Sequence, residues 1–567
     1  MENITKDASP KSINSEQPYR TWYHFQPLKN WMNGEVQVVG LRYLRSIYLH
    51  VTGPMYYKGV YHFFYQRNPD GATFGHEKMV WGHSVSKDLI NWTHLNDAIE
   101  PSCIGDSKSC FSGSATILPG EKPLMLYTGI DGKGHQVQNL AMPKNLSDPY
   151  LREWEKHPQN PLMTAPSGVE ENEFRDPSTA WQGKDGKWRV IIGAQKGDQG
   201  KAILYKSEDF VNWIVDPNPF YATDGTGVCE CPEFFPVYIN STNGVDTTME
   251  NSSVRHVLKI SYYRRHLDFY FIGKYASDSD QEKFIPDAKY TETYKDLRFD
   301  YGLYYASKSF FDYATNRRIL WGWVEEHDSK QDSIDKGWAG LQTIPRKIWL
   351  DKSGKQLIQW PIEELEKLRD KQISITGETL LSGSILEVKG VTASQADVEV
   401  LFELPDLQSA ELLEPSEVDP QILSGEQYAS RKGVIGPFGL QVLASKDLTE
   451  KTTISFRIFR VVDKYICLMI SDPSRSSLRQ GLTKPIYATV FDIDPNIKTI
   501  SLRTLIDRSI IESFGDGGRA CITSRVYPLL AIEKDAHLYV FNDGNQSVVI
   551  SQLNAWSMKQ AEFATES

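Results

Sequence analysis

Short runs in which apolar and polar residues alternate fill the chain from about residue 55 to residue 350. The runs are rich in Val, Ile, Tyr, Phe and Trp, and turns of Gly, Pro, Asn and Asp separate them. Clear examples are YYKGVYHFFYQ, KPLMLYTGI, KWRVIIGAQ, HVLKISYY, LDFYFIGKY and RILWGWV. A period of two predicts β-strands, and hardly a segment here has the 3.6-residue period of an amphipathic helix. This part of the chain is therefore predicted to be all-β.

One heptapeptide of this region occurs twice in related form. Residues 86–92 read SKDLINW, and residues 207–213 read SEDFVNW. Repeated strand groups that each end in a turn with an aromatic residue indicate a β-propeller built from several four-stranded blades. The alternative architecture for such a stretch is one large β-sandwich.

The pattern changes near residue 361, where PIEELEKL has Pro in a first-turn position and apolar residues three apart. This predicts one short amphipathic helix. Beyond it, ILEVKG, DVEVLFEL, TTISFRIFRVV, TISLRTLID and SIIESFGDGG alternate again, as in a two-sheet sandwich. We therefore expect a disordered N-terminal segment at 1–21, a propeller domain at 22–355, a linker with the short helix at 356–371, a β-sandwich domain at 372–560 and a loose tail from about Ala555.

Composition and charge narrow the class of partner without identifying a substrate. A net charge of −11 argues against nucleic acid, and no apolar run is long enough to span a membrane. The six cysteines lack the paired spacing of a zinc site, so we expect no metal and no cofactor. No apolar signal region is visible at the N-terminus, whereas six Asn-x-Ser/Thr sequons are compatible with glycosylation; they begin at Asn3, Asn91, Asn145, Asn240, Asn251 and Asn545.

Two short acidic motifs are candidates for catalysis. In EFRDP, Arg175 stands beside Asp176 and Pro177 stiffens the turn, so the carboxylate is held ionised. In CECPEFFP, Glu230 stands among apolar residues and prolines, where burial favours the protonated form that a general acid needs. Each motif alone is also compatible with an ordinary turn. Together they indicate glycoside cleavage, in which one carboxyl group donates a proton and others hold or attack the sugar cation.

Further motifs make a family resemblance specific. They are HFQP at 24–27, WMN at 31–33, FYQ at 64–66, FSGSAT at 111–116, FRDP at 174–177, ECP at 230–232, YG at 301–302 and GWAG at 337–340. In this order, the chain from residue 22 to residue 556 resembles glycoside hydrolase family 32, the plant cell-wall invertases and fructan exohydrolases. Pro232 after Glu-Cys is similar to the cell-wall group. The resemblance implies an all-β fold, a five-bladed β-propeller followed by a β-sandwich.

The resemblance also implies a retaining double-displacement reaction and a role for each site residue. Glu230 would be the acid/base, and Asp176 would stabilise the transition state. The sugar site would be lined by Trp31, Asn33, Gln66, Phe74, Phe111, Ser112 and Arg175. The expected protein is a monomer secreted to the cell wall or apoplast. Its expected partners are fructan or sucrose as substrate and a proteinaceous inhibitor, and neither nucleic acid nor membrane.

Two departures from the invertases bear on the substrate. Phe74 and Phe111 stand where invertases typically place Trp, and residues 261–266 read SYYRRH where invertases read Ser-Leu-Asp-Asp-Thr-Lys. Tyr263 and His266 thus replace the Asp and Lys associated with the glucose of sucrose. Losing hydrogen-bond partners matched to substrate hydroxyls penalises that substrate strongly. We therefore expect release of terminal fructose from fructans, with most similarity to a 6&1-type fructan exohydrolase. The alternatives are sucrose hydrolysis by an invertase and a non-catalytic fructan-binding homologue.

The nucleophile is missing from its expected place. Family members follow Trp-Met-Asn with Asp-Pro-Asn-Gly, and that Asp attacks the sugar. Here Asn33 is followed by the 19-residue run GEVQVVGLRYLRSIYLHVT at 34–52, which holds no Asp, before Gly53 and Pro54. We interpret the run as a skipped mini-exon with translated intron, in preference to an evolved insertion. Glu35 is displaced by one residue and one methylene, which makes it a poor substitute. The printed chain is therefore expected to be inactive.

Overall fold

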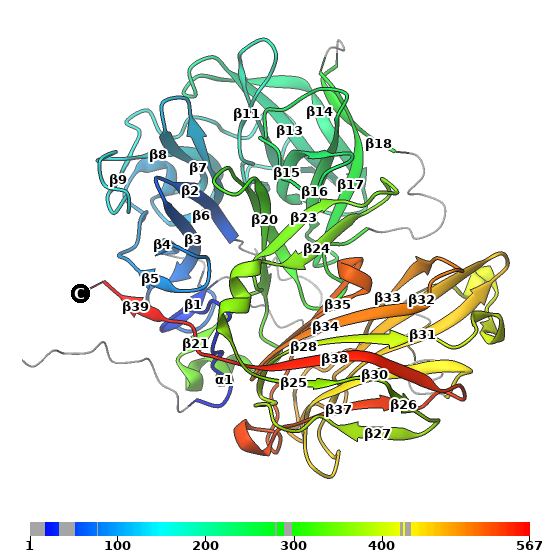
Figure 1. Ribbon diagram of the computed structural model, residues 1–567. Helices are drawn as coiled ribbons and strands as arrows, with labels where there is room; N and C mark the ends of the chain where they lie inside the picture. The colour runs from blue at the N-terminus through cyan, green and yellow to red at the C-terminus, as the bar shows by residue number, and fades with distance from the viewer. Residues whose placement is uncertain are drawn as a thin grey trace, which may run out of the picture.

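The computed structural model describes residues 17–32, 51–75, 78–277, 281–287, 297–419, 423, 425 and 432–566. Within these residues the chain forms a propeller-like N-terminal part of small sheets and a C-terminal sandwich of two larger sheets (Figure 1). The predicted all-β fold, with a propeller-like part before a sandwich, is confirmed. Asn33, Glu35 and the anomalous run as far as residue 50 lie outside the described residues, as does most of the N-terminal segment expected to be disordered.

Four sheets of the N-terminal part consist of consecutive strands. The first holds β6 (Ser109–Leu118), β7 (Lys122–Ile130), β8 (Gln136–Pro143) and β9 (Trp154–Lys156). The second holds β10 (Phe174–Arg175), β11 (Trp181–Gln182), β12 (Trp188–Lys196), β13 (Gln199–Ser207) and β14 (Trp213–Asp224). The third holds β15 (Cys229–Tyr238), β16 (Val254–Tyr262), β17 (Leu267–Ala276) and β18 (Lys283–Pro286). The fourth holds β19 (Tyr305–Asp312), β20 (Arg317–Val324), β22 (Leu341–Gln342), β23 (Arg346–Leu350) and β24 (Leu357–Pro361).

A further sheet joins distant parts of the sequence. Its order is β21 (Trp338–Ala339), β1 (Asn30–Met32), β3 (Val60–Asn68), β4 (Val80–Ser86), β5 (Trp92–His94) and β39 (Phe563–Thr565), and β2 (Val51–Tyr57) also pairs with β3. The parallel pairing of β1 with β21 places Trp31 of the WMN motif opposite Ala339 of GWAG. Since β2 begins at Val51, the last two residues of the anomalous run belong to a regular strand.

The C-terminal tail is ordered, so the expectation of a loose end from about Ala555 is wrong. Ala555 lies inside β38 (Val548–Met558), and β39 pairs in parallel with β5 (Figure 1). The physical reason is an aromatic contact that has no local sequence signal. The ring of Phe563 packs edge-on against that of Phe25, with 6.3 Å between centroids.

The two related heptapeptides fold alike. In each, a Ser hydroxyl donates to an Asp two residues on, Ser86 to Asp88 and Ser207 to Asp209, both at 3.1 Å. The same Asp accepts the N–H of the residue three positions later, at 2.9 Å and 2.7 Å. Each heptapeptide therefore forms the same Ser-Asp turn, which joins β4 to β5 in one sheet and β13 to β14 in another.

Helices are few and short in the described residues. The α-helix α1 (Lys330–Lys336) begins after the N-cap Ser329 and ends at Gly337, whose φ of 74° suits glycine. The predicted helix near residue 361 is present as the 3-10 helix η3 (Glu363–Leu368), with Leu365 and Leu368 buried. The other 3-10 turns are η1 (Ile104–Asp106), η4 (Leu407–Ser409), η5 (Pro415–Glu417), η6 (Asp516–Gly518) and η7 (Glu533–Asp535).

The C-terminal part has two sheets around one core. One has the order β25 (Arg369–Ile375), β38, β28 (Gln395–Glu403), β34 (Thr499–Asp507), β35 (Ile510–Gly515) and β36 (Ala520–Arg525), with β26 (Glu378–Leu380) on β38. The other has the order β27 (Ser384–Glu387), β37 (His537–Asn542), β30 (Ile435–Ala444), β31 (Thr452–Val461), β32 (Lys464–Asp472) and β33 (Tyr487–Ile493), with β29 (Glu411–Leu412) on β31. Buried apolar side chains of both sheets meet between them, as expected for a sandwich.

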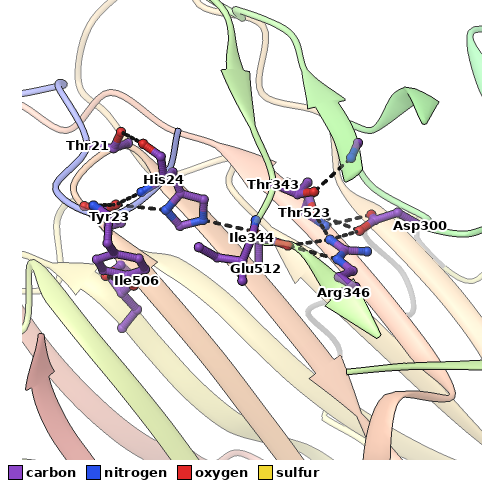
Figure 2. Close-up of polar contacts among 12 residues, drawn as sticks. Thr21, Tyr23, His24, Asp300, Thr343, Ile344, Arg346, Ile506, Glu512 and Thr523 are labelled. Atoms are coloured by element: carbon purple, nitrogen blue, oxygen red, sulfur yellow. Dashed lines mark hydrogen bonds and ion pairs between the residues drawn. The ribbon is translucent and has the colours of Figure 1, made fainter. Parts of the chain in front are cut away.

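A buried polar network joins the two parts. Asp507, at the end of β34, accepts hydrogen bonds from the backbone N–H groups of residues 22–24 at 2.7–3.0 Å and from His24 Nδ1 at 2.8 Å. His24 Nε2 lies 2.9 Å from Glu512, which also binds Arg346 from the N-terminal part (Figure 2). Both nitrogens of the His24 ring thus contact carboxylates of the sandwich. These contacts fix the segment that leads into β1 against the sandwich.

Candidate functional site

Most of the expected site residues lie on strands of the N-terminal part: Phe111 and Ser112 on β6, Arg175 on β10, Glu230 on β15, Trp31 on β1 and Gln66 on β3. β6 contacts β10, and β15 contacts β19. Three of these strands lose regular register at the residues of interest: β6 between Cys110 and Gly113, β15 between Glu230 and Glu233, and β19 between Tyr305 and Lys308. A bulge turns side chains out of the strand alternation and is common beside functional sites.

Glu230 is held by two different donors. Its Oε1 accepts hydrogen bonds from Arg175 Nε at 2.9 Å and Nη2 at 2.8 Å. Its Oε2 accepts one from the hydroxyl of Tyr305 at 2.5 Å. All three side chains are buried. The carboxyl group is therefore fixed in orientation by a cation on one side and a phenol on the other.

Asp176 is bound from the strand that carries Glu230. Its Oδ2 accepts the backbone N–H of Cys231 at 3.0 Å, and its own N–H donates to Thr128 at 2.9 Å. Asp176 has a φ of 65° and Cys231 a φ of 43°, so both lie in the left-handed region. Such strain in non-glycine residues persists where surrounding contacts determine the conformation. Asp176 and the Glu230 segment are thus held together in an unusual backbone geometry.

A glycine permits this close approach. Gly193 in β12 lies opposite Arg175, and a Cβ built there would stand 2.0 Å from the carbonyl oxygen of Cys229 and 3.1 Å from that of Arg175. Any larger residue would push apart the two segments that carry the acids. Sequence reasoning did not single out Gly193, because its role depends on a strand from another sheet.

The guanidinium of Arg175 contacts several acidic and polar side chains of the site. Besides Glu230, it donates to Glu173 at 2.6 Å and to Gln136 at 3.1 Å. Burial alone would lower its pKa, but the carboxylates of Glu173, Glu230 and Asp176 outweigh burial and raise the pKa above its ordinary value. The guanidinium is therefore permanently charged, and it organises three acids at once.

Two further expected site residues contact each other. Ser112 donates to the side-chain oxygen of Gln66 at 3.1 Å, and Gln66 donates to the carbonyl of Cys110 at 3.1 Å. Both lie on bulged or central strands of neighbouring sheets, β6 and β3. Asn33, expected beside them, lies outside the described residues.

The three expected aromatic residues form one small cluster. Trp31 and Phe111 are each 1% exposed and pack with Met79, and the Phe74 ring lies 5.4 Å from the Trp31 ring. The expected position of Phe111 in the sugar site stays a prediction; its side chain lies in the apolar cluster beside Trp31.

The hairpin between β16 and β17 brings Tyr263 and His266, two residues that differ from the invertases, into the site. The Tyr263 ring lies 5.7 Å from the Arg175 guanidinium carbon. His266, with a φ of 52°, stacks on the ring of Tyr305, with 5.1 Å between centroids and 14° between planes. Both residues that replace the invertase Asp and Lys are thus within reach of groups that hold Glu230.

Several residues that sequence reasoning missed lie under the site. Lys259 donates to the carbonyls of Cys231 and Ser307, at 3.2 Å and 2.8 Å. Lys308 donates to Ser114, which in turn donates to the carbonyl of Pro177, both at 2.8 Å. These buried lysines tie the bulged segments together, and no local motif marks them.

The described residues contain neither a candidate metal site nor a membrane-spanning helix. No three His, Cys, Asp or Glu side chains there are grouped so as to hold a metal ion. No helix among the same residues is long and apolar enough to cross a membrane.

Two buried carboxyl groups, one held by a guanidinium and a phenol and the other by the backbone N–H of Cys231, are typical of a glycosidase. Comparison with protein families agrees with this class: the glycosyl hydrolases family 32 N-terminal domain matches residues 24–361, and the family 32 C-terminal domain matches residues 364–557. The chain belongs to glycosyl hydrolase family 32.

Individual relatives cover nearly the whole chain. The insoluble β-fructofuranosidase isoenzyme CWINV1 of Arabidopsis thaliana is 54% identical over 570 residues, covering 99% of this chain and 94% of that protein. Fructan 6-exohydrolase of Beta vulgaris is 50% identical, covering 97% and 88%. The crystal structure of fructan 1-exohydrolase IIa from Cichorium intybus has a TM-score of 0.92 at 54% identity, covering 98% and 100%, and a second structure of that enzyme contains 1-kestose.

Proposed function

We propose that the site is built to release terminal fructose from fructans by a retaining mechanism, with Glu230 as acid/base and Asp176 as stabiliser of the transition state. The observation that carries this is the crossed pair of contacts: Arg175 binds Glu230 and the Cys231 N–H binds Asp176, each at no more than 3.0 Å. The names of the relatives support a fructosyl substrate, since they include β-fructofuranosidases and fructan exohydrolases.

In this mechanism, Glu230 first protonates the leaving oxygen and later removes a proton from the attacking water. Asp176 holds hydroxyl groups of the fructosyl unit as positive charge develops on its ring. Arg175, Gln66, Ser112, Trp31 and the aromatic Phe74 and Phe111 line or support the subsite, together with Asn33. A covalent intermediate also needs a carboxylate nucleophile, which the printed sequence lacks after Asn33.

The preference for fructan over sucrose rests on Tyr263 and His266. Neither offers the paired carboxylate and ammonium that would bind glucose hydroxyls, and the two rings lie 6.5 Å apart beside Arg175 and Tyr305. An aromatic surface accepts a further fructosyl unit by stacking as readily as glucose, so the lost hydrogen bonds decide against sucrose.

The proposal also includes the molecular organisation expected from the sequence. We infer that the β1-containing sheet is a fifth blade, since its strand β2 contacts both β6 and β19, the first strands of the sheets on either side. We keep the proposed boundaries of propeller, linker and sandwich at 22–355, 356–371 and 372–560. Secretion to the cell wall, a monomeric state and an inhibitor partner remain part of the proposal; the word "insoluble" in the name of one relative supports the first.

Two proteins test this function. The chain as printed is expected to release no fructose from inulin, levan or sucrose above background, since losing a covalent nucleophile costs about 10⁴-fold or more in turnover. A variant with residues 34–52 replaced by Asp-Pro-Asn is expected to hydrolyse inulin or levan with a higher kcat/KM than sucrose. Equal or better hydrolysis of sucrose would favour an invertase.

The matched control is Glu230→Gln in the replaced variant, which is expected to abolish turnover. Calorimetric titration of the printed chain with 1-kestose examines the non-catalytic alternative. Binding together with an inactive replaced variant would establish a fructan-binding homologue and refute the hydrolase.

A further inference from the structure

A chain of contacts leads from Glu230 to the surface of the hairpin between β16 and β17. Glu230 Oε2 accepts the Tyr305 hydroxyl at 2.5 Å. The imidazole of His266 stacks on a face of the Tyr305 ring, with 5.1 Å between ring centroids and 14° between the ring planes. His266 Nδ1 in turn lies 3.4 Å from Glu325, which follows β20. Glu230 and His266, from two separate segments, therefore contact one buried phenol, and Glu325 contacts His266.

The two ends of this chain differ in exposure. Tyr305 is 2% exposed and Glu230 is fully buried, whereas the side chains of His266 and Glu325 are 28% and 18% exposed. His266 can therefore exchange protons with solvent, while Glu230 is shielded from it. An imidazole is the one ordinary side chain that changes its charge between pH 5 and pH 8.

We propose that His266 is a positioning residue that couples Glu230 to solvent pH through the ring of Tyr305, so that protonation of His266 strengthens the Tyr305–Glu230 hydrogen bond. This goes beyond the substrate preference assigned to His266 above and rests on the proposed acid/base role of Glu230. A cation over the face of a phenol withdraws electron density from the ring. The hydroxyl group then donates a stronger hydrogen bond to a carboxylate. Protonated His266 and ionised Glu230 thus stabilise each other.

The coupling must work in both directions, because linkage between two sites is reciprocal. At acid pH, charged His266 favours the ionised form of Glu230 and so makes it a stronger acid towards the leaving oxygen. As pH rises and His266 loses its proton, this assistance is withdrawn. The hairpin would therefore set the pH range over which Glu230 can serve as proton donor and acceptor.

Several other charged or aromatic groups lie near His266 among the residues that the structure describes. On its own hairpin, Arg264 pairs with Asp198, Arg265 lies over the ring of Phe269 at 5.9 Å, and Tyr263 is 6.5 Å away ring to ring. From the strands packed against it come Tyr305 and Glu325. Glu325 contacts the imidazole directly, so its contribution has to be separated from that of Glu230.

Titration of His266 by NMR tests the proposal without any substrate, so the outcome is independent of whether fructan is hydrolysed. The full chain has 12 histidines. Labelling them with ¹³C at Cε1 and comparing with His266→Lys assigns the His266 signal. In Glu230→Gln the titration midpoint of His266 is expected to fall by about half a pH unit, since a nearby negative charge is removed. Tyr305→Phe keeps the stacked ring and loses the hydroxyl, so Glu230→Gln added to it is expected to cause less than half of that shift.

Glu325→Gln is the matched control, because it removes the direct ion pair and must also lower the midpoint. An unchanged midpoint in Glu230→Gln, while Glu325→Gln shifts it, would overturn the proposal. So would an equal effect of Glu230→Gln with and without the Tyr305 hydroxyl, because the charge would then act through space and not through the phenol. The other eleven histidine signals report whether each variant is folded.

Discussion

The backbone N–H of Cys231 donates to the carboxylate of Asp176 at 3.0 Å, while Arg175, next to Asp176, binds Glu230, next to Cys231. Each acidic motif therefore holds the acid of the other. The orientation of either carboxyl group depends on both peptide segments. A change in one segment should therefore alter the orientation of both carboxyl groups.

Arg175→Lys tests this mutual support in the variant with Asp-Pro-Asn in place of residues 34–52. Lysine cannot make the two contacts from Nε and Nη2 to one carboxylate oxygen. We expect kcat for inulin to fall about a hundredfold, the cost of a misplacement of about 1 Å. Steady-state rates of fructose release measure this, and an unchanged kcat would show that Arg175 does not orient Glu230.

Gly193→Ala should separate the two acidic segments. The added methyl group would stand 2.0 Å from the carbonyl oxygen of Cys229, which is backbone and cannot rotate away. We expect a loss of about 1–3 kcal/mol in the free energy of unfolding, as for overpacked interiors. Urea unfolding measures it. Gly132→Ala is the control, because its new methyl group would meet only a hydroxyl at 3.6 Å; equal losses in both variants would contradict the prediction.

His24 should make stability depend on pH. Burial lowers its pKa, but hydrogen bonds to Asp507 and Glu512 outweigh burial and raise the pKa above 6.5. A raised folded pKa means that the stabilisation is complete below pH 6.5 and is lost as pH rises through the folded value. His24→Gln is expected to cost about 3–5 kcal/mol at pH 5.5, and the difference from the unaltered chain should shrink towards pH 9.

Unfolding in urea at several pH values measures the His24 effect. His157→Gln serves as control, since the hydrogen bond described for the His157 side chain is to a backbone N–H two residues away. A cost for His24→Gln that is constant from pH 5.5 to pH 9 would show that the imidazole is not charged in the folded protein.

Glu326 and Asp328, which both pair with Lys336, should contribute to stability in opposite ways. Burial raises the pKa of Glu326, but Arg525 and Lys336 outweigh it and lower the pKa. Burial and the charge of Glu326 raise the pKa of Asp328 to about 6. Above pH 6, Asp328 is thus charged at a cost, whereas Glu326 provides stability that is present above pH 4.5 and is lost as pH falls through its lowered pKa.

Glu326→Gln is therefore expected to lower the free energy of unfolding at pH 7.5 by about 3–5 kcal/mol, because Arg525 would lose its buried partner. Asp328→Asn at the same pH is expected to be neutral or stabilising. Guanidinium unfolding of both variants measures the contrast, and equal destabilisation by the two changes would be inconsistent with it.

Features of this fold that depend on residues close together in the sequence could be predicted from it. Strands such as β7 and β20 follow from alternation, the Ser-Asp turns from the repeated heptapeptide, and Glu230 and Asp176 from short motifs. The partners that orient these acids could not be predicted, because Thr128, Gln136 and Gly193 come from other strands and carry no local signal.

The last strand has a consequence for how the molecule is divided. After the sandwich ends with β38, the chain returns to the N-terminal part and β39 pairs with β5. The propeller-like part is thus discontinuous in the sequence, and its outermost strand in this sheet is synthesised after the sandwich. A fragment that stops at residue 361 would leave the backbone groups of β5 exposed along one edge, so completion of the catalytic part has to wait until the sandwich has been synthesised.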